Sequence, residues 1–264
     1  MIRSLFLLML LALVFIAGCT DKPEGPLTGR FELYVQDALA DYDSVYLTID
    51  TIATRSTLET STWTNIYAGP RTVELTSLRN GNRLLILSRD FQLGRIGGLK
   101  VSFGDGRVIV GGVSRELQFM DTVNASGFAD GIIVINTDRD TQALIDINLA
   151  RSISYDAGED VYRFSPEMTF IDFDSTGSII GSTEPRANIY LFEHDSTEAY
   201  SFTISEFDLN LFGFYGLPEG LYDVLVAPRG SDTLIYDSLF NTDITIFPDT
   251  EYDMGLLDLP LLEG

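Results

Sequence analysis

The chain has 264 residues, of which 39 are acidic and 17 are basic, so its formal net charge is −22. This charge repels nucleic acid and anionic lipid surfaces, and we expect no nucleic-acid partner. Hydrophobic residues make up 45% of the chain and no block of like charges gathers the acidity, which predicts a folded protein rather than an acidic disordered tail. A single cysteine excludes an internal disulfide.

The first twenty residues have the pattern of a secretory signal peptide. Arg3 is followed by an apolar run over 5–16 and then by a pair of small residues before Cys19. The run is shorter than the roughly 18 apolar residues that a membrane-spanning helix needs, although an uncleaved anchor is the alternative. We therefore predict a signal peptide over residues 1–18.

The segment Val14–Cys19 resembles the lipobox of bacterial lipoproteins. The resemblance implies that Cys19 receives a diacylglyceryl group and acyl chains such as palmitate, and becomes the N-terminus of the mature protein. It also implies an outer-membrane lipoprotein, because Thr20 rather than aspartate follows the cysteine. The resemblance does not imply which face of the outer membrane carries the protein. A plain secretory signal would instead leave Cys19 as a free thiol. Residues 19–27 contain two prolines and are expected to form a tether.

From residue 28 onward apolar residues alternate at period two, which is typical of half-buried strands. In Arg30–Gln36 and Ser44–Asp50 every second side chain is apolar, and residues 37–43 between them are expected to form a loop. A short strand at Trp63–Tyr67 is expected to end at Gly69–Pro70. Residues 73–78 fit either a strand or a helical turn. Further strands are predicted, in order, at 84–87, 99–103, 108–110, 132–135, 144–149, 162–164 and 168–173.

Turn residues separate these runs at intervals of roughly 8–12 residues, which favours a β-sandwich or barrel. Gly104–Gly106 is expected to be a hairpin turn, because it lacks the third glycine and the helix of a dinucleotide-binding loop. Ile132–Ile135 is continuously apolar and is expected to be covered on both faces. No window after the signal peptide has apolar residues at helical spacing over several turns, so we predict an all-β protein with two β-sandwich domains.

Several pieces of this region resemble, in order, a family of bacterial lipoprotein domains known as domain of unknown function 4382. They are Asp37–Val45 continuing into Thr48–Asp50, Leu93–Ile96, Asp146–Ile153 and Phe164–Pro166. The chain departs from the family at Leu39, where proline is usual, and at Ser165, where lysine is usual. Because the family has no established activity, the resemblance implies a fold and a location for residues 28–174 but no mechanism.

A second set of strands follows the turn-rich segment 172–177, so we predict a second domain over residues 175–264. Its strands are expected, in order, at 177–181, 188–192, 200–204, 207–214, 222–226, 244–246 and 252–259. Gly216–Val224 and Met254–Leu259 resemble the carboxypeptidase regulatory-like module. That resemblance implies a small transthyretin-like sandwich that carries no catalysis itself.

His194 is the only histidine of the chain. A Ser-His-Asp triad would use it as the base, but no Gly-x-Ser-x-Gly elbow accompanies it, and we expect an exposed residue where a strand enters a turn. A zinc site would need further histidines or thiolates. We therefore predict that the protein is not an enzyme.

Carboxylates are the only abundant chemistry, and calcium takes six or more oxygen ligands. Residues 136–140 begin like a calcium loop, but Thr141 and Ile147 occupy the places of its glycine and glutamate. For every candidate the alternative is a solvated turn, in which aspartate bonds to the backbone. No spacing singles out a carboxylate pair for glycoside hydrolysis. The candidate calcium ligands are Asp37, Asp41, Asp43, Asp172 and Asp174.

Aromatic residues are the remaining candidates for binding. Tyr34 and Tyr46 fall on the outward faces of the first two strands, and Phe212, Phe214 and Tyr215 precede a glycine. Such side chains stack on sugars, form protein interfaces or pack against a second layer. We predict a lipid-anchored cell-envelope protein that binds a protein partner, a surface polymer or a glycan, or has a structural role, with no cofactor unless calcium binds. The alternatives are a carboxylate-dependent carbohydrate-active hydrolase and a subunit of a surface fibre.

Overall fold

Strands make up 69% of the structure, which is a computed structural model, and helices make up 7%, which confirms the all-β prediction. No helix in the described part of the chain is long and apolar enough to cross a membrane. The predicted signal peptide and Cys19 lie outside the described residues. The structure describes residues 27–38, 42–58, 62–120, 125–206 and 209–262.

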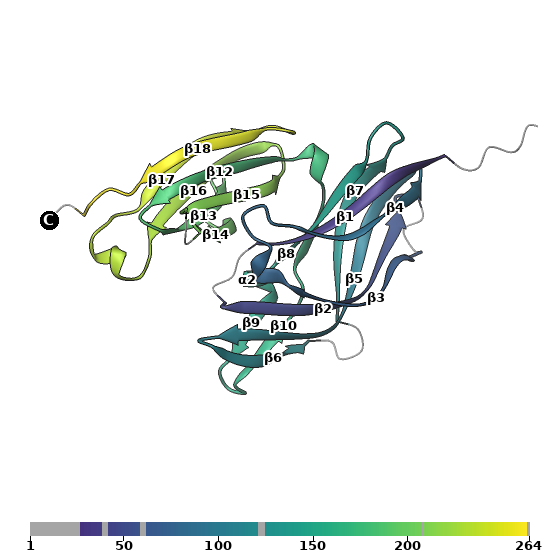
Figure 1. Ribbon diagram of the computed structural model, residues 1–264, viewed down its shortest axis with the longest axis horizontal. Helices are drawn as coiled ribbons and strands as arrows, with labels where there is room; N and C mark the ends of the chain where they lie inside the picture. Colours follow the sequence, from purple (N-terminus) through teal and green to yellow (C-terminus); the bar gives the residue numbers. More distant parts are fainter. Residues whose placement is uncertain (1–26, 39–41, 59–61, 121–124, 207–208, 263–264) are drawn as a thin grey trace, which may run out of the picture.

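The strands before residue 173 form the N-terminal domain (Figure 1). They are β1 (Thr28–Ala38), β2 (Ser44–Ser56), β3 (Thr64–Glu74), β4 (Leu84–Gln92), β5 (Gly94–Val110), β6 (Val113–Phe119), β7 (Ala125–Ile135), β8 (Thr141–Asn148), β9 (Ile153–Asp156), β10 (Val161–Phe164) and β11 (Met168–Asp172). The first sheet has the order β11-β8-β1-β4. The second sheet has the order β3-β2-β5-β6-β10-β9, and β7 also pairs with β5. The short helices are η1 (Leu75–Ser77), α2 (Leu149–Ser152) and η2 (Phe173–Ser175).

Alternating apolar side chains from both sheets fill one core. In β1, Phe31 and Leu33 are fully buried, and β1 pairs with β8 in parallel and with β4 in antiparallel orientation. Val45 and Leu47 of β2 enter the same core from the second sheet. Burying one such side chain stabilises the fold by about 1.5–3 kcal/mol. The strands predicted at 30–36 and 44–50 are therefore confirmed.

Two expected chain reversals lie inside longer strands. Gly104–Gly106 is not a hairpin turn but part of β5, which continues for 17 residues with shifts of register against β2. A Cβ atom at Gly106 would lie 2.6 Å from Cδ2 of Leu47, so close packing explains this glycine. The prediction that a strand ends at Gly69–Pro70 is also wrong, because β3 is an edge strand, where proline is tolerated.

The continuous apolar run in β7 is covered on one face only. Ile133 is fully buried, but Ile132 is 61% exposed, so the expectation of two covered faces is wrong. The hydrophobic pattern also does not predict β6, β9 or α2. Most side chains of β6 are polar or exposed, and β9 and α2 have four residues each, too few for a periodic signal.

The strands after η2 form the C-terminal domain, which has its own hydrophobic core. They are β12 (Gly177–Glu184), β13 (Ala187–Glu193), β14 (Ala199–Ile204), β15 (Leu211–Leu217), β16 (Gly220–Pro228), β17 (Leu239–Ile246) and β18 (Glu251–Asp258), with η3 (Gly230–Leu234) between β16 and β17. One sheet has the order β15-β12-β18 and the other the order β14-β13-β16-β17. Among the described strands, none pairs with a strand of the other domain.

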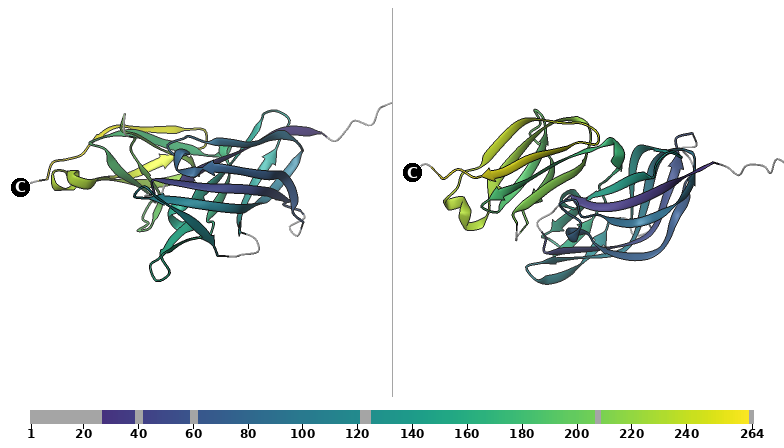
Figure 2. Two further views of the ribbon diagram at one scale, coloured as in Figure 1. Left: turned by 60° about the horizontal axis from the view of Figure 1, so that its bottom comes forward. Right: turned by 45° about the horizontal axis from the view of Figure 1, so that its top comes forward.

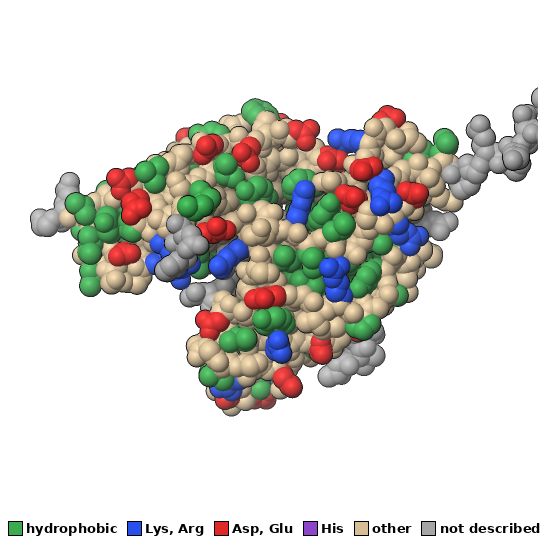
Figure 3. All heavy atoms as spheres, in the orientation of Figure 1, with side chains coloured by type: hydrophobic (Ala, Val, Ile, Leu, Met, Phe, Trp, Pro, Cys, Tyr) green, Lys and Arg blue, Asp and Glu red, His purple; other side chains and the backbone are tan. Residues whose placement is uncertain are grey.

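The two domains lie side by side, with the start of β1 and the C-terminus at opposite ends of the molecule (Figures 1 and 2). Acidic and basic side chains are scattered over both domains on the face seen in Figure 3. That face therefore shows no single acidic patch, as expected from the even spread of charge along the sequence.

Candidate functional site

An open groove crosses the second sheet of the N-terminal domain over β2, β3, β5 and β6. Its volume is about 630 Å³, which falls within the roughly 300–1,000 Å³ of typical ligand pockets. We call it the sheet groove. Its lining residues are Tyr46, Thr48, Thr72, Gly104, Asp105, Gly106, Arg107, Glu116, Leu117 and Phe119.

An aromatic ring and a cation pair within the sheet groove. The guanidinium carbon of Arg107 lies 4.2 Å from the centre of the Tyr46 ring, and the two residues face each other across β2 and β5. Such a contact contributes about 0.5–1 kcal/mol at an exposed site. Because Arg107 is exposed, the pair presents a ring and a positive charge to a ligand.

Polar side chains complete the sheet groove. The hydroxyl groups of Thr48 and Thr72 are hydrogen-bonded at 2.9 Å, and Asp105 and Glu116 supply exposed carboxylates. These groups offer donors and acceptors to a hydroxylated ligand.

The glycines of β5 leave the floor of the sheet groove open. Gly104 and Gly106 contribute no side chains, and the carboxylate of Asp50 occupies the space beside Gly104, where a Cβ atom would lie 2.7 Å from both of its oxygens. A side chain at either position would displace a neighbour or fill the groove. The glycines that mislead the strand prediction thus shape this site.

A second aromatic pair lies further along the same sheet. The rings of Trp63 and Phe128 are 5.8 Å apart, and Phe128 is 59% exposed. Arg55 lies 5.2 Å from the centre of the Trp63 ring, and Lys100 lies 5.4 Å from that of Phe128. The second sheet therefore carries two exposed combinations of ring and cation.

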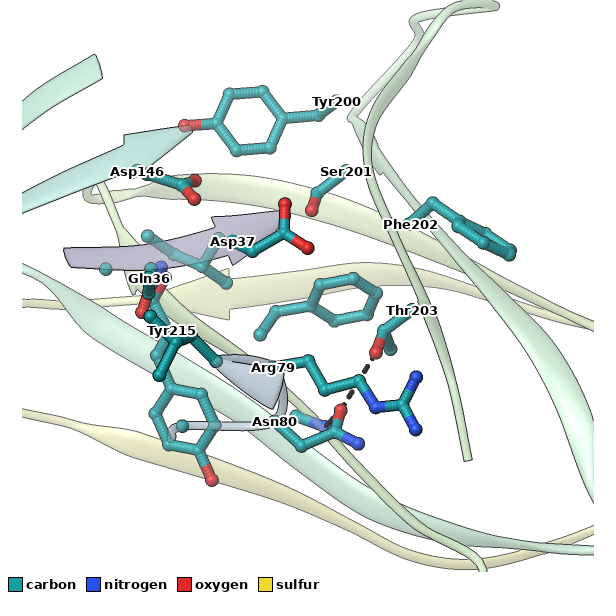
Figure 4. Close-up of a pocket in the computed structure, with 16 residues that line it drawn as sticks. Gln36, Asp37, Arg79, Asn80, Asp146, Tyr200, Ser201, Phe202, Thr203 and Tyr215 are labelled. Atoms are coloured by element: carbon teal, nitrogen blue, oxygen red, sulfur yellow. Dashed lines mark hydrogen bonds between the residues drawn. The ribbon is translucent and has the colours of Figure 1, made fainter. Parts of the chain in front are cut away.

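A small pocket, here called the joint pocket, lies between the two domains (Figure 4). About 30 Å³ of it is open to water-sized molecules, which is room for a water or two. Gln36 and Asp37 of β1 and Asp146 of β8 line it from the N-terminal domain. Tyr200 and Ser201 of β14 line it from the C-terminal domain.

Asp37 is the buried acid of the joint pocket, with only 6% of its surface exposed. Burial, followed by the nearby Asp146, holds the pKa of Asp37 well above its ordinary value, while the N–H of Leu149 and the charge of Arg79 act in the opposite direction. Burial, with a smaller effect of Asp146, also raises the pKa of Tyr200 to about 12. The pocket therefore disfavours negative charge as it stands.

Asn80 connects the N-terminal domain to both sheets of the C-terminal domain. Its side-chain oxygen accepts hydrogen bonds from the hydroxyl of Thr203 at 2.8 Å and from the N–H of Gly213 at 3.2 Å. Its amide donates to the carbonyl of Ile204 at 3.4 Å. Asn80 has a φ of 52°, which asparagine tolerates better than most residues.

Two further side chains reach the same edges. Gln36 donates to the carbonyl of Tyr215 at 3.3 Å, and Arg151 donates to the carbonyl of Ala199 at 3.4 Å. The strands β14 and β15 are edge strands of the two C-terminal sheets. Side chains of the N-terminal domain thus satisfy backbone groups on both edges.

The structure separates the predicted calcium ligands. Asp37 lies in β1 rather than in a loop, because it pairs with Ile147 of β8. Asp43 accepts a hydrogen bond from the N–H of Gly112 at 2.8 Å, and Asp41 lies outside the described residues. Among the residues that the structure describes, no three acidic, histidine or cysteine side chains are grouped to hold a metal.

The other two candidates lie at the junction of the domains, Asp172 at the end of β11 and Asp174 within η2. Burial, followed by Asp174, raises the pKa of Asp172. Asp174 forms an ion pair with Arg139 at 3.6 Å. Because Asp174 is paired with an arginine, the segment around η2 resembles an ordinary turn of charged residues.

His194 follows β13 and is surrounded by acids. Its Nδ1 lies 3.2 Å from Asp223, and its Nε2 lies 3.7 Å from both Asp195 and Asp243. The hydrogen bond to Asp223 is the main cause of the raised pKa of His194. His194 and these carboxylates form an ion-pair cluster that joins the end of β13 to β16 and β17. Among the described residues, no serine, threonine or cysteine side chain is hydrogen-bonded to the imidazole of His194.

His194 is expected to make stability depend on pH. Because its pKa is higher in the folded protein than in the unfolded chain, its contribution is fully present below the unfolded pKa of about 6.5 and is lost as the pH rises through the folded pKa. The melting temperature of His194→Gln should therefore fall furthest below wild type at pH 5.5 and approach it at pH 8.5. Thermal melts across this range test this, and parallel pH profiles would contradict it.

The predicted exposed aromatics divide into three groups. Tyr46 lines the sheet groove, while Tyr34 lies under Arg83 at 4.5 Å. Phe212 and Phe214 are core residues of the C-terminal domain, so they follow the alternative in which such side chains pack against a second layer. Tyr215 is half-buried, and its ring lies where a Cβ atom of the facing glycine, residue 81, would be.

Comparison with known families matches residues 28–166 to Domain of unknown function (DUF4382), which is more than half of the chain. The chain belongs to the DUF4382 family. This confirms the resemblance seen in the N-terminal sequence. Among curated proteins no match is found for this DUF4382 chain.

Matches to solved structures include the following three bacterial proteins. The TIE protein of Bacillus anthracis is 11% identical with a TM-score of 0.26; the match covers 93% of this chain and 42% of that one. A mutant of the shaft pilin SpaA from Lactobacillus rhamnosus GG is 7% identical with a TM-score of 0.27, and the match covers 91% of this chain and 99% of that one. The major pilin T-13 of Streptococcus pyogenes is 11% identical with a TM-score of 0.19, and the match covers 90% of this chain and 99% of that one. Scores this low carry no argument about role.

Proposed function

We propose that this DUF4382 chain is a lipid-anchored cell-envelope protein that binds a glycan or a related surface polymer and catalyses no reaction. The observation that carries the binding role is the sheet groove, where Tyr46, Arg107 and two threonine hydroxyls lie in one open channel. Sugars stack on aromatic rings and exchange hydrogen bonds with such groups. The second ring pair, Trp63 with Phe128, gives an extended ligand a further contact on the same sheet.

The location rests on the sequence from Val14 to Cys19 and on its resemblance to a lipobox. A tether before β1 would enter the molecule at the end opposite the C-terminus (Figure 1). The sheet groove lies in the N-terminal domain, which would be the domain nearer to the membrane. We propose the outer membrane, and a C-terminal module of the carboxypeptidase regulatory-like type with a structural role.

Binding of purified protein to an array of bacterial polysaccharides tests this role. Tyr46→Ala is expected to lower the affinity for a bound glycan about tenfold, since an aromatic contact contributes about 0.5–1.5 kcal/mol beyond the buried area. Tyr155→Ala is the matched control, because Tyr155 is an exposed tyrosine of the same sheet that does not line the groove. Equal binding by wild type and Tyr46→Ala would exclude the sheet groove.

A hydrolase is the second candidate, because Asp105 and Glu116 line the same groove. Incubating a bound polysaccharide with wild type and Glu116→Gln distinguishes the two roles. We expect neither protein to release reducing ends. Release by wild type alone would assign the groove to catalysis. A fibre formed by strand exchange gains no support from β18, which pairs with β12 of its own domain.

A further inference from the structure

The carboxyl group of Asp37 has no partner in the joint pocket. Neither of its oxygens has a hydrogen bond among the described residues, although only 6% of the residue is exposed. The N–H of Leu149 lies near but outside hydrogen-bond geometry. Leaving a buried carboxyl group unsatisfied is costly, so an additional group that contacts it would stabilise the fold.

No described residue of the joint pocket forms an ion pair with Asp37. Arg79 lines the same pocket without a hydrogen bond to either oxygen of that carboxyl group. Figure 4 shows the guanidinium of Arg79 directed away from Asp37, whose carboxyl group is turned towards Ser201, while the carboxyl group of Asp146 is directed towards Asp37. Two carboxyl groups that share a buried site cannot both be ionised at little cost, so they share a proton or bind a cation.

We propose that the joint pocket binds a divalent cation, calcium, between the carboxylates of Asp37 and Asp146, with the hydroxyl of Ser201 as a further ligand. All three groups offer oxygen, which calcium prefers. The open volume of about 30 Å³ accommodates one ion with little water. Magnesium keeps several waters and fits such a pocket less well.

The ion would join the domains, since Asp37 and Asp146 come from the first N-terminal sheet and Ser201 comes from edge strand β14. Two carboxylates are few for calcium, so we expect weak binding in the range of about 10⁻⁴–10⁻³ M that is typical of extracellular modules. This site goes beyond the glycan-binding role, and neither depends on the other.

Thermal melts of the purified full-length protein in detergent test the site. With 10 mM calcium instead of a chelator, the melting temperature of wild type should rise by about 3 °C or more, because the ion binds only the folded state. Asp37→Asn should lose this rise, and Asp258→Asn should keep it, since Asp258 is an exposed carboxylate of β18. No rise in wild type, or an equal rise in all three proteins, would overturn the proposal.

Terbium luminescence gives a second readout that needs no change at Asp37. Tyr200 lines the pocket and is close enough to Asp146 for that acid to affect its pKa, so excitation of Tyr200 should sensitise a bound terbium ion. We expect emission that calcium displaces and that Tyr200→Phe reduces several-fold. Terbium emission that is absent, or that is unchanged in Tyr200→Phe, would refute the site. In the thermal melts, stabilisation by acid without any response to calcium would also refute it and would show that Asp37 and Asp146 share a proton instead.

Discussion

Replacing Asn80 with alanine is expected to lower the free energy of unfolding by about 2.5–5.5 kcal/mol. Three hydrogen bonds are lost, to Thr203, Gly213 and Ile204, each with a net contribution of about 0.5–1.5 kcal/mol. Alanine at a φ of 52° adds strain of about 1 kcal/mol or more. Because these bonds join the domains, the C-terminal domain should unfold at a lower denaturant concentration than the N-terminal domain.

Chemical denaturation followed by tyrosine and tryptophan fluorescence measures this loss. Asn80→Gly separates the two causes, since glycine adopts the positive φ freely but lacks the side-chain bonds. Asn82→Ala is the matched control, because Asn82 is exposed and only its backbone makes a contact. An unchanged midpoint for Asn80→Ala would show that this turn contributes nothing to the attachment of the domains.

Replacing Cys19 with alanine should move the protein from the membrane fraction to the soluble fraction or leave it as an uncleaved precursor. The acyl chains are attached through the sulfur and its new amino terminus, so the variant loses the whole anchor. Each buried methylene contributes about 0.8 kcal/mol, and two or more chains are needed for stable attachment. The described residues contain no spanning helix to replace them.

Fractionation of cells and immunoblotting measure the change, and mass spectrometry of the N-terminal peptide identifies the lipid. Thr20→Ala is the control, because it alters the neighbouring residue and keeps the sulfur. Wild-type protein with an intact, unmodified first segment would contradict the lipoprotein assignment. So would full retention in the membrane pellet of Cys19→Ala protein whose signal peptide has been removed.

The strands with strict alternation could be predicted from sequence alone. In β1 and β2 a one-residue shift would turn Phe31 or Leu47 out of the core, so the pattern determines which face is buried. Glycine and proline mislead the prediction at Gly104–Gly106 and Gly69–Pro70. Both segments continue as strands because neighbouring strands, not local turn preference, decide the conformation there.

The candidate sites are only partly predictable. Tyr46 stands out as an outward aromatic, but Arg107 and Glu116 reach the same groove only through the pairing of β2, β5 and β6. The sequence singles out Asp37 for its spacing from Asp41 and Asp43, whereas its neighbour in the fold is Asp146. Contacts between residues about one hundred positions apart leave no periodic signal in a single sequence.

The role of Asn80 illustrates the same limit. Its sequence context, Asn80–Gly81, predicts a turn, and the structure has one with positive φ at both residues. The contacts of the asparagine side chain with β14 and β15 depend on where the second domain packs. No local pattern reports that position.

The coverage of β14 and β15 by the first domain has a consequence for biogenesis. Both strands have backbone groups that Gln36, Asn80 and Arg151 satisfy, and bare strand edges are templates for aggregation. Synthesis delivers the first domain before the second. The surface that shields these edges is therefore finished before they emerge, and a truncated chain that starts at β12 should express as self-associating, protease-sensitive material.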